Sequence, residues 1–234
     1  MSRSLNLSNS ELIEKSVANN ESELTHTGAL LSLTGNRTGR SPKDRFIVQE
    51  SSTKDKIDWG DVNKPFDSNH FDKLWEKVSA YLDDKEHYVS NVHVGSNKDH
   101  YIPVEVKSEL AWHSLFSKLI FISPEIFNEE NKEVWKIVTA ANYVCDPEED
   151  HTNSESCVII NFLRRKVLIA GMKYAGEMKK SMFAVQNFLL PEKGVLPMHC
   201  SANQTSDKRT TLFFGLSGTG TVSYTHLRAH ETSD

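Results

Sequence analysis

The chain has 234 residues, of which 38% are hydrophobic and 25% charged, the proportions of an ordinary globular protein with a substantial core. A balance of 27 basic against 32 acidic residues gives a net charge of -5. This balance argues against a nucleic-acid or membrane-surface protein, since both usually carry a basic face. The sequence has no run of eighteen apolar residues and no signal-peptide core near its N-terminus. We therefore expect a soluble, cytoplasmic protein with no nucleic-acid or membrane partner.

The cysteines do not suggest a disulfide framework. Cys145, Cys157 and Cys200 are odd in number, widely spaced and without a CxxC pair. Cytosolic proteins keep their cysteines reduced, whereas extracellular proteins usually pair them. We expect three reduced, mostly buried thiols.

Helices and strands are expected to alternate through the first half of the chain. Residues 10–18 predict a short helix. The Gly-, Thr- and Asn-rich stretch 25–50 predicts short strands and turns, and the polar stretch 49–69 a surface excursion. From Phe71 to Leu82 the apolar residues recur at helical spacing, and HYVSNVHVG (87–95) then predicts a strand.

The second half continues in the same mixed way. Apolar residues from Ala111 to Leu119 predict a second amphipathic helix, and residues 177–190 predict a third, which Pro191 stops. Four short apolar runs predict strands: SCVIINF (156–162), KVLIAG (166–171), VLPMHC (195–200) and RTTLFFGL (209–216). The mixture predicts an α+β fold with mixed sheets.

The last apolar run passes directly into glycines, in TTLFFGLSGTG (210–220). A phosphate-binding loop requires a strand, then Gly, four residues, and Gly-Lys followed by Ser or Thr. Its glycines let the backbone turn tightly and direct several N–H groups to one anion. Gly215 and Gly220 satisfy the spacing, and the alternative is the turn-rich end of a hairpin.

Thr221 and Val222 stand where the loop needs its lysine and its metal-binding hydroxyl. A charge-assisted contact to phosphate contributes roughly 1.5–3 kcal/mol, so its loss weakens binding by on the order of 10- to 100-fold. Residues 221–234 show neither a helical apolar stripe nor a capping pattern. We interpret them as a foreign tail, because YTHLRAHET resembles translated sequencing-adapter read-through. A divergent native sequence is the alternative.

Three further motifs precede the glycine loop: TGRSPKDRF (38–46), YAGEMKKSMF (174–183) and MHCSAN (198–203). In this order, from about Leu24 to Gly220, the chain resembles the ATP-dependent phosphoenolpyruvate carboxykinase family. The resemblance implies a gluconeogenic lyase that converts oxaloacetate and ATP to phosphoenolpyruvate, carbon dioxide and ADP. It also implies Mg²⁺ with the ATP, a second metal that is typically Mn²⁺, and a monomeric parent enzyme.

The resemblance assigns catalytic roles to Arg40, Tyr174 and Lys180. Arg40 is expected to bind the substrate carboxylate, which its planar guanidinium suits. On the residues alone, the alternative is a surface arginine paired with Asp44. Tyr174 is expected beside the substrate and the carbon dioxide site, and its alternative is a half-buried aromatic at a helix entrance.

Lys180 and His199 match the family's protein ligands to manganese. Neutral imidazole is a common metal ligand, but a lysine ligand must be neutral, which requires burial or a nearby cation to lower its pKa. On the residues alone, Lys180 is a solvated helix charge and His199 a core or strand histidine. Lys179 also matches the motif, but successive helical positions face different ways.

Four residues match the front half of the family's ATP phosphate loop: Ser217, Gly218, Thr219 and Gly220. The family continues with Lys-Thr-Thr, metal-binding carboxylates and a second substrate arginine, none of which follows here. The resemblance therefore implies an N-terminal carboxykinase domain in residues 1–193, the start of the nucleotide-binding domain in 194–220, and a non-native tail in 221–234.

Two functional hypotheses follow. In the first, the chain is a fragment that holds one wall of the cleft between two carboxykinase domains and is inactive by itself. In the second, it is a non-catalytic oxaloacetate-binding or regulatory module. A generic P-loop kinase is disfavoured, because its loop normally follows the first strand of the fold.

Overall fold

The computed structural model describes residues 3–215. These residues divide into two compact units, one up to Val185 and one from Gln186 on. The division falls inside the last long helix, ahead of the domain boundary that we predict after Lys193. The predicted phosphate loop beyond Gly215 and the predicted tail lie outside the described residues.

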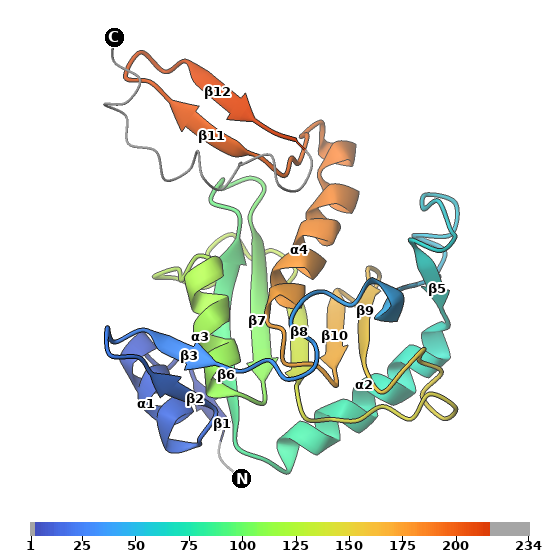
Figure 1. Cartoon of the computed structure of the whole chain (residues 1–234). Coiled ribbons are helices and arrows are strands. Elements are labelled where there is room, and N and C mark those ends of the chain that lie inside the picture. The colour runs from blue at the N-terminus through green and yellow to red at the C-terminus, as the bar shows by residue number, and fades with distance from the viewer. Residues whose placement is uncertain (1–2, 216–234) are drawn as a thin grey trace. The chain divides into compact units, whose positions relative to one another are not determined.

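The first unit is built on one mixed, eight-stranded sheet (Figure 1). Its strands, in spatial order, are β1 (Arg3–Leu5), β6 (His87–Val94), β7 (Ile102–Ser108), β8 (Trp135–Ala140), β10 (Lys166–Ala170), β9 (Cys157–Asn161), β4 (Arg45–Val48) and β5 (Lys64–Phe66). The pairs β6–β7 and β10–β9 are antiparallel, and the other neighbours are parallel. A mixed sheet with helices packed on it confirms the predicted α+β class.

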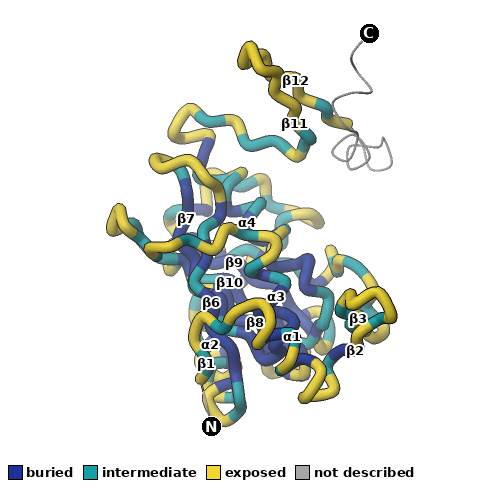
Figure 2. The backbone as a smooth tube through the Cα atoms, turned by 90° about the vertical axis from the view of Figure 1, so that its left-hand side faces the viewer, coloured by how far each residue is buried: buried dark blue, intermediate teal, exposed yellow. Residues whose placement is uncertain are grey.

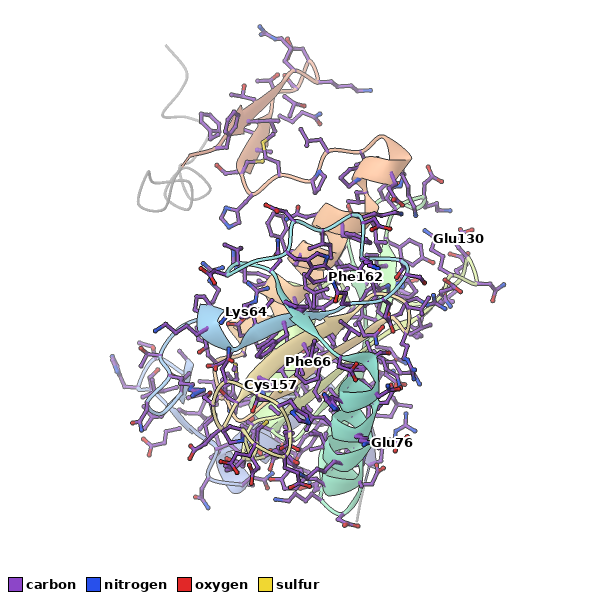
Figure 3. The ribbon with its side chains drawn as sticks, turned by 90° about the vertical axis from the view of Figure 1, so that its right-hand side faces the viewer. Lys64, Phe66, Glu76, Glu130, Cys157 and Phe162 are labelled. Atoms are coloured by element: carbon purple, nitrogen blue, oxygen red, sulfur yellow. The ribbon has the colours of Figure 1, made fainter. Side chains whose placement is uncertain are left out.

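One face of the sheet is covered by α2 (Ser68–Asp83). Asp67 caps this helix by accepting hydrogen bonds from the backbone N–H groups of Asn69 and His70. The helix buries the apolar face that the periodicity predicts. The cluster that it forms with the sheet includes Phe71, Leu74, Val78, Leu82, Ile159 and Leu168. Phe66 and Cys157, which Figure 3 labels, belong to the same cluster.

The opposite face carries α1 (Asn9–Ala18) and α3 (Ala111–Ile120). Ser8 and Glu11 form a reciprocal capping box at the start of α1, so this end is set by the local sequence. Leu12, Tyr88 and Leu115 are buried together where the two helices meet β6. The short hairpin β2 (Ser22–Leu24) and β3 (Leu30–Ser32) follows α1. Every residue of β9, which lies in the interior of the sheet, is buried (Figure 2).

The sheet register brings two distant segments together. The start of β4 and the end of β10 both pair with the start of β9, since Arg45 lies opposite Val158 and Ala170 opposite Cys157. β10 is followed by Gly171, whose φ of +71° is unfavourable for other residues, and a Cβ there would lie 2.2 Å from the Glu155 carbonyl oxygen. The chain then turns into α4 (Gly176–Leu189). The segment before β4 and the segment leading into α4 thus lie at the same end of the sheet, where β4 begins and β10 finishes.

Beyond Gln186 the chain ends α4, makes a short 3₁₀ turn at η2 (Pro191–Lys193) and forms the hairpin β11 (Ser201–Gln204) and β12 (Thr210–Phe213). The strand predicted over residues 195–200 is wrong, because the pairing starts only at Ser201. Pro197 has no N–H to donate to a ladder, which disfavours a strand there. Strands β1, β5, β7 and β8 were not predicted, and β2 precedes the stretch 25–50 in which short strands were expected.

The three described cysteines are free, as predicted, and Cys145 and Cys157 are buried with their Sγ atoms 3.9 Å apart. Within residues 3–215, no helix combines the length and the apolar content needed to cross a membrane.

The buried His113 predicts an acid-dependent stability. Its imidazole contacts the Lys173 carbonyl oxygen (2.8 Å) and the Thr139 hydroxyl (3.2 Å), and burial lowers its pKa from 6.5 to about 4. Between these values the unfolded chain binds a proton that the folded chain does not, so stability falls as the pH falls from about 6.5 to about 4. The loss should be on the order of 3 kcal/mol.

Urea unfolding of the wild type and of His113→Gln across this pH range measures the effect. We expect the variant to lose much of the slope, whereas His26→Gln, at an exposed position, keeps it. Parallel slopes for the wild type and His113→Gln contradict the prediction.

The hairpin predicts poor solubility of the chain. Within the described residues β12 pairs only with β11, and Leu196, Leu212 and Phe214 are 77%, 47% and 68% exposed (Figure 2). Exposed strand edges with large apolar side chains promote aggregation. Deleting everything after Lys193 should raise the soluble fraction measured by centrifugation and light scattering. Leu212→Ser with Phe214→Ser should give part of the same gain, and no change in either variant contradicts the prediction.

Candidate functional site

The segment before β4 is held by a buried network around Asp44, the last residue of the 3₁₀ turn η1 (Pro42–Asp44). The Asp44 carboxylate accepts hydrogen bonds from the hydroxyls of Ser41, Ser154 and Ser156. The guanidinium of Arg37 lies 3.6 Å from the same carboxylate and also donates to both Ser154 and Ser156. The charge of Asp44 is therefore compensated inside the fold.

Arg40 is not the partner of Asp44, so the pairing that the sequence left open is wrong. Arg37 takes that place. Arg40 is exposed, and its guanidinium makes no ion pair and no hydrogen bond within residues 3–215. Arg40 and Lys43 are thus the exposed cations of this segment, and Arg40 is the one that the family resemblance assigns to substrate.

Arg40 borders a shallow cleft of about 570 Å³. The cleft is lined by Arg40, Ser41, Pro42, Lys43, Asp44, Lys64, Asn153 and Ser154. Lys64, labelled in Figure 3, donates to the Lys43 carbonyl oxygen at 2.9 Å. Because Asp44 is compensated by Arg37, the three basic side chains leave this cleft suited to an anion.

Glu177 joins this segment to the first turn of α4. Its side chain is fully buried, and Oε1 accepts a hydrogen bond of 3.0 Å from the backbone N–H of Ser41. Oε2 lies 3.8 Å from Nε of Arg45. Reasoning from the sequence alone missed this residue. The only signal in the sequence is an acidic residue in the first helical turn. That signal is not specific, because such residues commonly interact favourably with the helix dipole.

Lys180 follows Glu177 by one helical turn and is partly buried. Its Nζ lies 5.7 Å from the centre of the Phe183 ring. Burial, and then the positive charges of Arg40, Lys179 and Arg45, lower the pKa of Lys180 below its ordinary value. Lys180 is therefore not the freely solvated helix charge that the sequence left open. The cations of the site favour the neutral amine that a lysine ligand requires.

Tyr174 lies against the start of the same helix. A Cβ atom on Gly176 would lie 2.6 Å from the Tyr174 ring and 2.8 Å from its hydroxyl, so the ring occupies the space above this glycine. Tyr174 is half-buried, and its carbonyl oxygen accepts a hydrogen bond of 3.3 Å from the Glu177 N–H. Gly176 thus allows the ring to pack onto the first turn of α4.

The remaining predicted site residues belong to other parts of the chain. His199 is exposed and precedes β11 in the second unit, so it is neither a core nor a strand histidine. Ser217, Gly218, Thr219 and Gly220 lie outside the described residues. Among residues 3–215, no group of three or more His, Cys, Asp or Glu side chains is placed to hold a metal ion. The structure thus groups Arg40, Tyr174 and Lys180 at one edge of the sheet.

Comparison with known proteins identifies the family. A model of the phosphoenolpyruvate carboxykinase family matches residues 2–231. The chain belongs to this family. It is 50% identical over 216 residues to the phosphoenolpyruvate carboxykinase (ATP) of Geobacillus kaustophilus, and 48% identical over 217 residues to that of Bacillus pumilus. Each match covers 92% of this chain and 41% of the relative.

The chain therefore spans about two fifths of the length of the carboxykinases that it matches. The family match extends past Gly220 to residue 231 and so includes most of the segment that we interpret as a foreign tail. The proposed division into domains and tail stays a prediction.

The proximity of Arg40 and Lys180 predicts a change in lysine reactivity. Arg40→Gln removes a cation that lowers the pKa of Lys180, so this pKa should rise and less of the amine should be neutral. Acylation of Lys180 by a limiting reagent, followed by mass spectrometry from about pH 7 to 10, should then shift to higher pH. The exposed Lys179 gives an internal reference in the same peptide.

Lys43→Gln is the matched control, since it removes a positive charge from the same segment and Lys43 is not among the groups that shift the pKa of Lys180 most. Equal shifts in both variants, or none in Arg40→Gln, contradict the prediction.

Proposed function

We propose that this chain supplies the substrate side of an ATP-dependent phosphoenolpyruvate carboxykinase. The reaction converts oxaloacetate and ATP to phosphoenolpyruvate, carbon dioxide and ADP, as part of gluconeogenesis in the cytoplasm, in a monomeric enzyme. Family membership supports the reaction. The observation that supports the position of the site is the grouping of Arg40, Tyr174 and Lys180 around the first turn of α4.

Arg40 is proposed to bind a carboxylate of oxaloacetate. Its guanidinium has no anionic partner among the described residues and borders a basic cleft. A planar, bidentate donor holds a carboxylate in one orientation, so Arg40 would fix the substrate during loss of carbon dioxide. Tyr174, whose ring rests on Gly176, would border the space that the leaving carbon dioxide occupies.

Lys180 and His199 are proposed to hold the manganese ion. The two side chains fit a nitrogen-donor metal site, because burial and the charge of Arg40 lower the pKa of Lys180 and a neutral imidazole is an ordinary nitrogen ligand, and the choice of manganese rests on the family resemblance. When bound, the metal would supply positive charge against the negative charge that develops on the substrate oxygen. Ser217 to Gly220 would contact the phosphates of Mg²⁺–ATP.

A non-catalytic role is the second candidate. It is favoured by one observation, namely that the substrate-side groups are present whereas Thr221 replaces the phosphate-loop lysine. A chain of this kind would retain oxaloacetate and bind ATP only weakly.

Activity assays separate these proposals. We expect the 234-residue chain to produce no phosphoenolpyruvate from oxaloacetate and ATP above a blank without protein. A chimera should be active if it joins residues 1–220 to the part of the Geobacillus kaustophilus relative beyond the region matched here. Turnover by the 234-residue chain alone, or an inactive but folded chimera, contradicts the proposal.

In the chimera, Arg40→Gln should raise KM for oxaloacetate by about 10- to 100-fold, the effect of losing a charge-assisted contact. Lys43→Gln, next to the same cleft, should change KM by less than about threefold. Equal effects of the two substitutions would argue for general attraction of the anion rather than a specific contact of Arg40.

A further inference from the structure

Glu177 is a buried charge that its surroundings satisfy only in part. The side chain is fully buried, and charged groups in that position are normally paired and hydrogen-bonded. Oε1 has one donor, the Ser41 N–H, whereas Oε2 has no hydrogen-bond partner among the described residues. Its nearest cation is Arg45, at 3.8 Å. A buried ion pair of this kind is weak evidence for a role in stability alone.

The contacts of Glu177 connect three separate elements. The first element is the segment that contains Arg40, because Glu177 accepts a hydrogen bond from the backbone N–H of the next residue, Ser41. Another is the first residue of β4, Arg45, and the third is α4, to which Glu177 itself belongs. Lys180 is its i+3 neighbour on the helix, and residues three apart lie side by side on a helical surface.

We propose that Glu177 is a positioning residue that sets the separation between the Arg40 guanidinium and the Lys180 amine. Its hydrogen bond to Ser41 ties the residue after Arg40 to the turn of α4 that carries Lys180. Pro42 begins η1 directly after Ser41, and the Ser41 hydroxyl donates to Asp44. Ser41, the residue after Arg40, is therefore restrained both through its backbone N–H and through its side-chain hydroxyl.

The negative charge of Glu177 also favours the close placement of the neighbouring cations. Arg40, Arg45 and Lys180 are cations close enough to influence one another, since Arg40 lowers the pKa of both other groups. Glu177 acts in the opposite direction on both. One buried carboxylate thus offsets the mutual repulsion of three cations from inside the protein, where screening by solvent is weak.

This inference rests on the proposed function for its consequence in catalysis, but its geometric part is tested without activity. Glu177→Asp keeps the charge and withdraws the carboxylate by one methylene, whereas Glu177→Gln keeps the reach of Oε1 and removes the charge. Amide hydrogen exchange of the 234-residue chain at Ser41 reports the bond, and exchange at Val48 and Ile159 in the sheet reports general stability. Glu14→Gln, at an exposed position of α1, is the control.

In Glu177→Asp, the Ser41 amide should exchange about 10- to 100-fold faster, the factor that corresponds to a lost hydrogen bond to a charged acceptor. Val48 and Ile159 should change by less than about threefold. In Glu177→Gln, protection of Ser41 should be largely retained. Equal acceleration at all three amides in Glu177→Asp, or unchanged exchange at Ser41, overturns the proposal. If Glu177→Asp does not fold, loss of Ser41 protection in Glu177→Gln overturns it instead.

The chimera supplies the readout in catalysis. Glu177→Asp should raise KM for oxaloacetate by about tenfold while kcat falls less, because the displaced Arg40 loses substrate binding. Glu177→Gln should stay closer to the parent in KM. Equal KM values in the parent and Glu177→Asp overturn the link to substrate. An inactive parent chimera contradicts the proposed function and leaves the exchange result to decide the role of Glu177.

Discussion

Repulsion between like charges is the constraint that this site has to meet. Arg40, Arg45 and Lys180 lie close enough for their charges to act on one another. The buried carboxylate of Glu177 offsets part of this repulsion, and the carboxylate of Asp44 is paired with Arg37. Both carboxylates are thus engaged inside the fold, whereas the guanidinium of Arg40 has no anionic partner among the described residues. This division of labour explains how a basic cleft occurs on a chain with a net charge of -5.

The sheet makes the charge arrangement possible. β9 is parallel to β4 and antiparallel to β10, so the beginning of β4 and the end of β10 meet at one edge. The candidate site residues Arg40, Tyr174 and Lys180 come from two motifs, the segment entering β4 and the segment following β10. Close packing on both faces favours this register, because a shift by one residue would place side chains of different size against the same neighbours in the core. The core is therefore what aligns Arg40 with Lys180.

Local sequence predicted the parts of the fold that local forces decide. The helical pattern of residues 10–18, the apolar stripe of α2 and the stop at Pro191 predicted helices close to those observed. The strand β7 was missed because Pro103 interrupts its apolar pattern, and β8 because a short apolar run carries no period that separates strand from helix. The family motifs predicted Arg40, Tyr174 and Lys180 as site residues. The partner of Asp44 could not be predicted, since Ser154 and Ser156, which complete the network, lie more than a hundred residues away in the chain.

The meeting of β4 and β10 through β9 also bears on how such a site can change over evolutionary time. The segment between the two motifs includes the polar excursion after β4 and the loop between α3 and β8, both at the surface. Insertions there lengthen the chain without altering which residues face each other across β9. The number of residues between the two motifs can therefore change, whereas the strand register is constrained. Distant members of the family should be easier to recognise by two motifs placed on either side of a shared strand than by any fixed spacing between them.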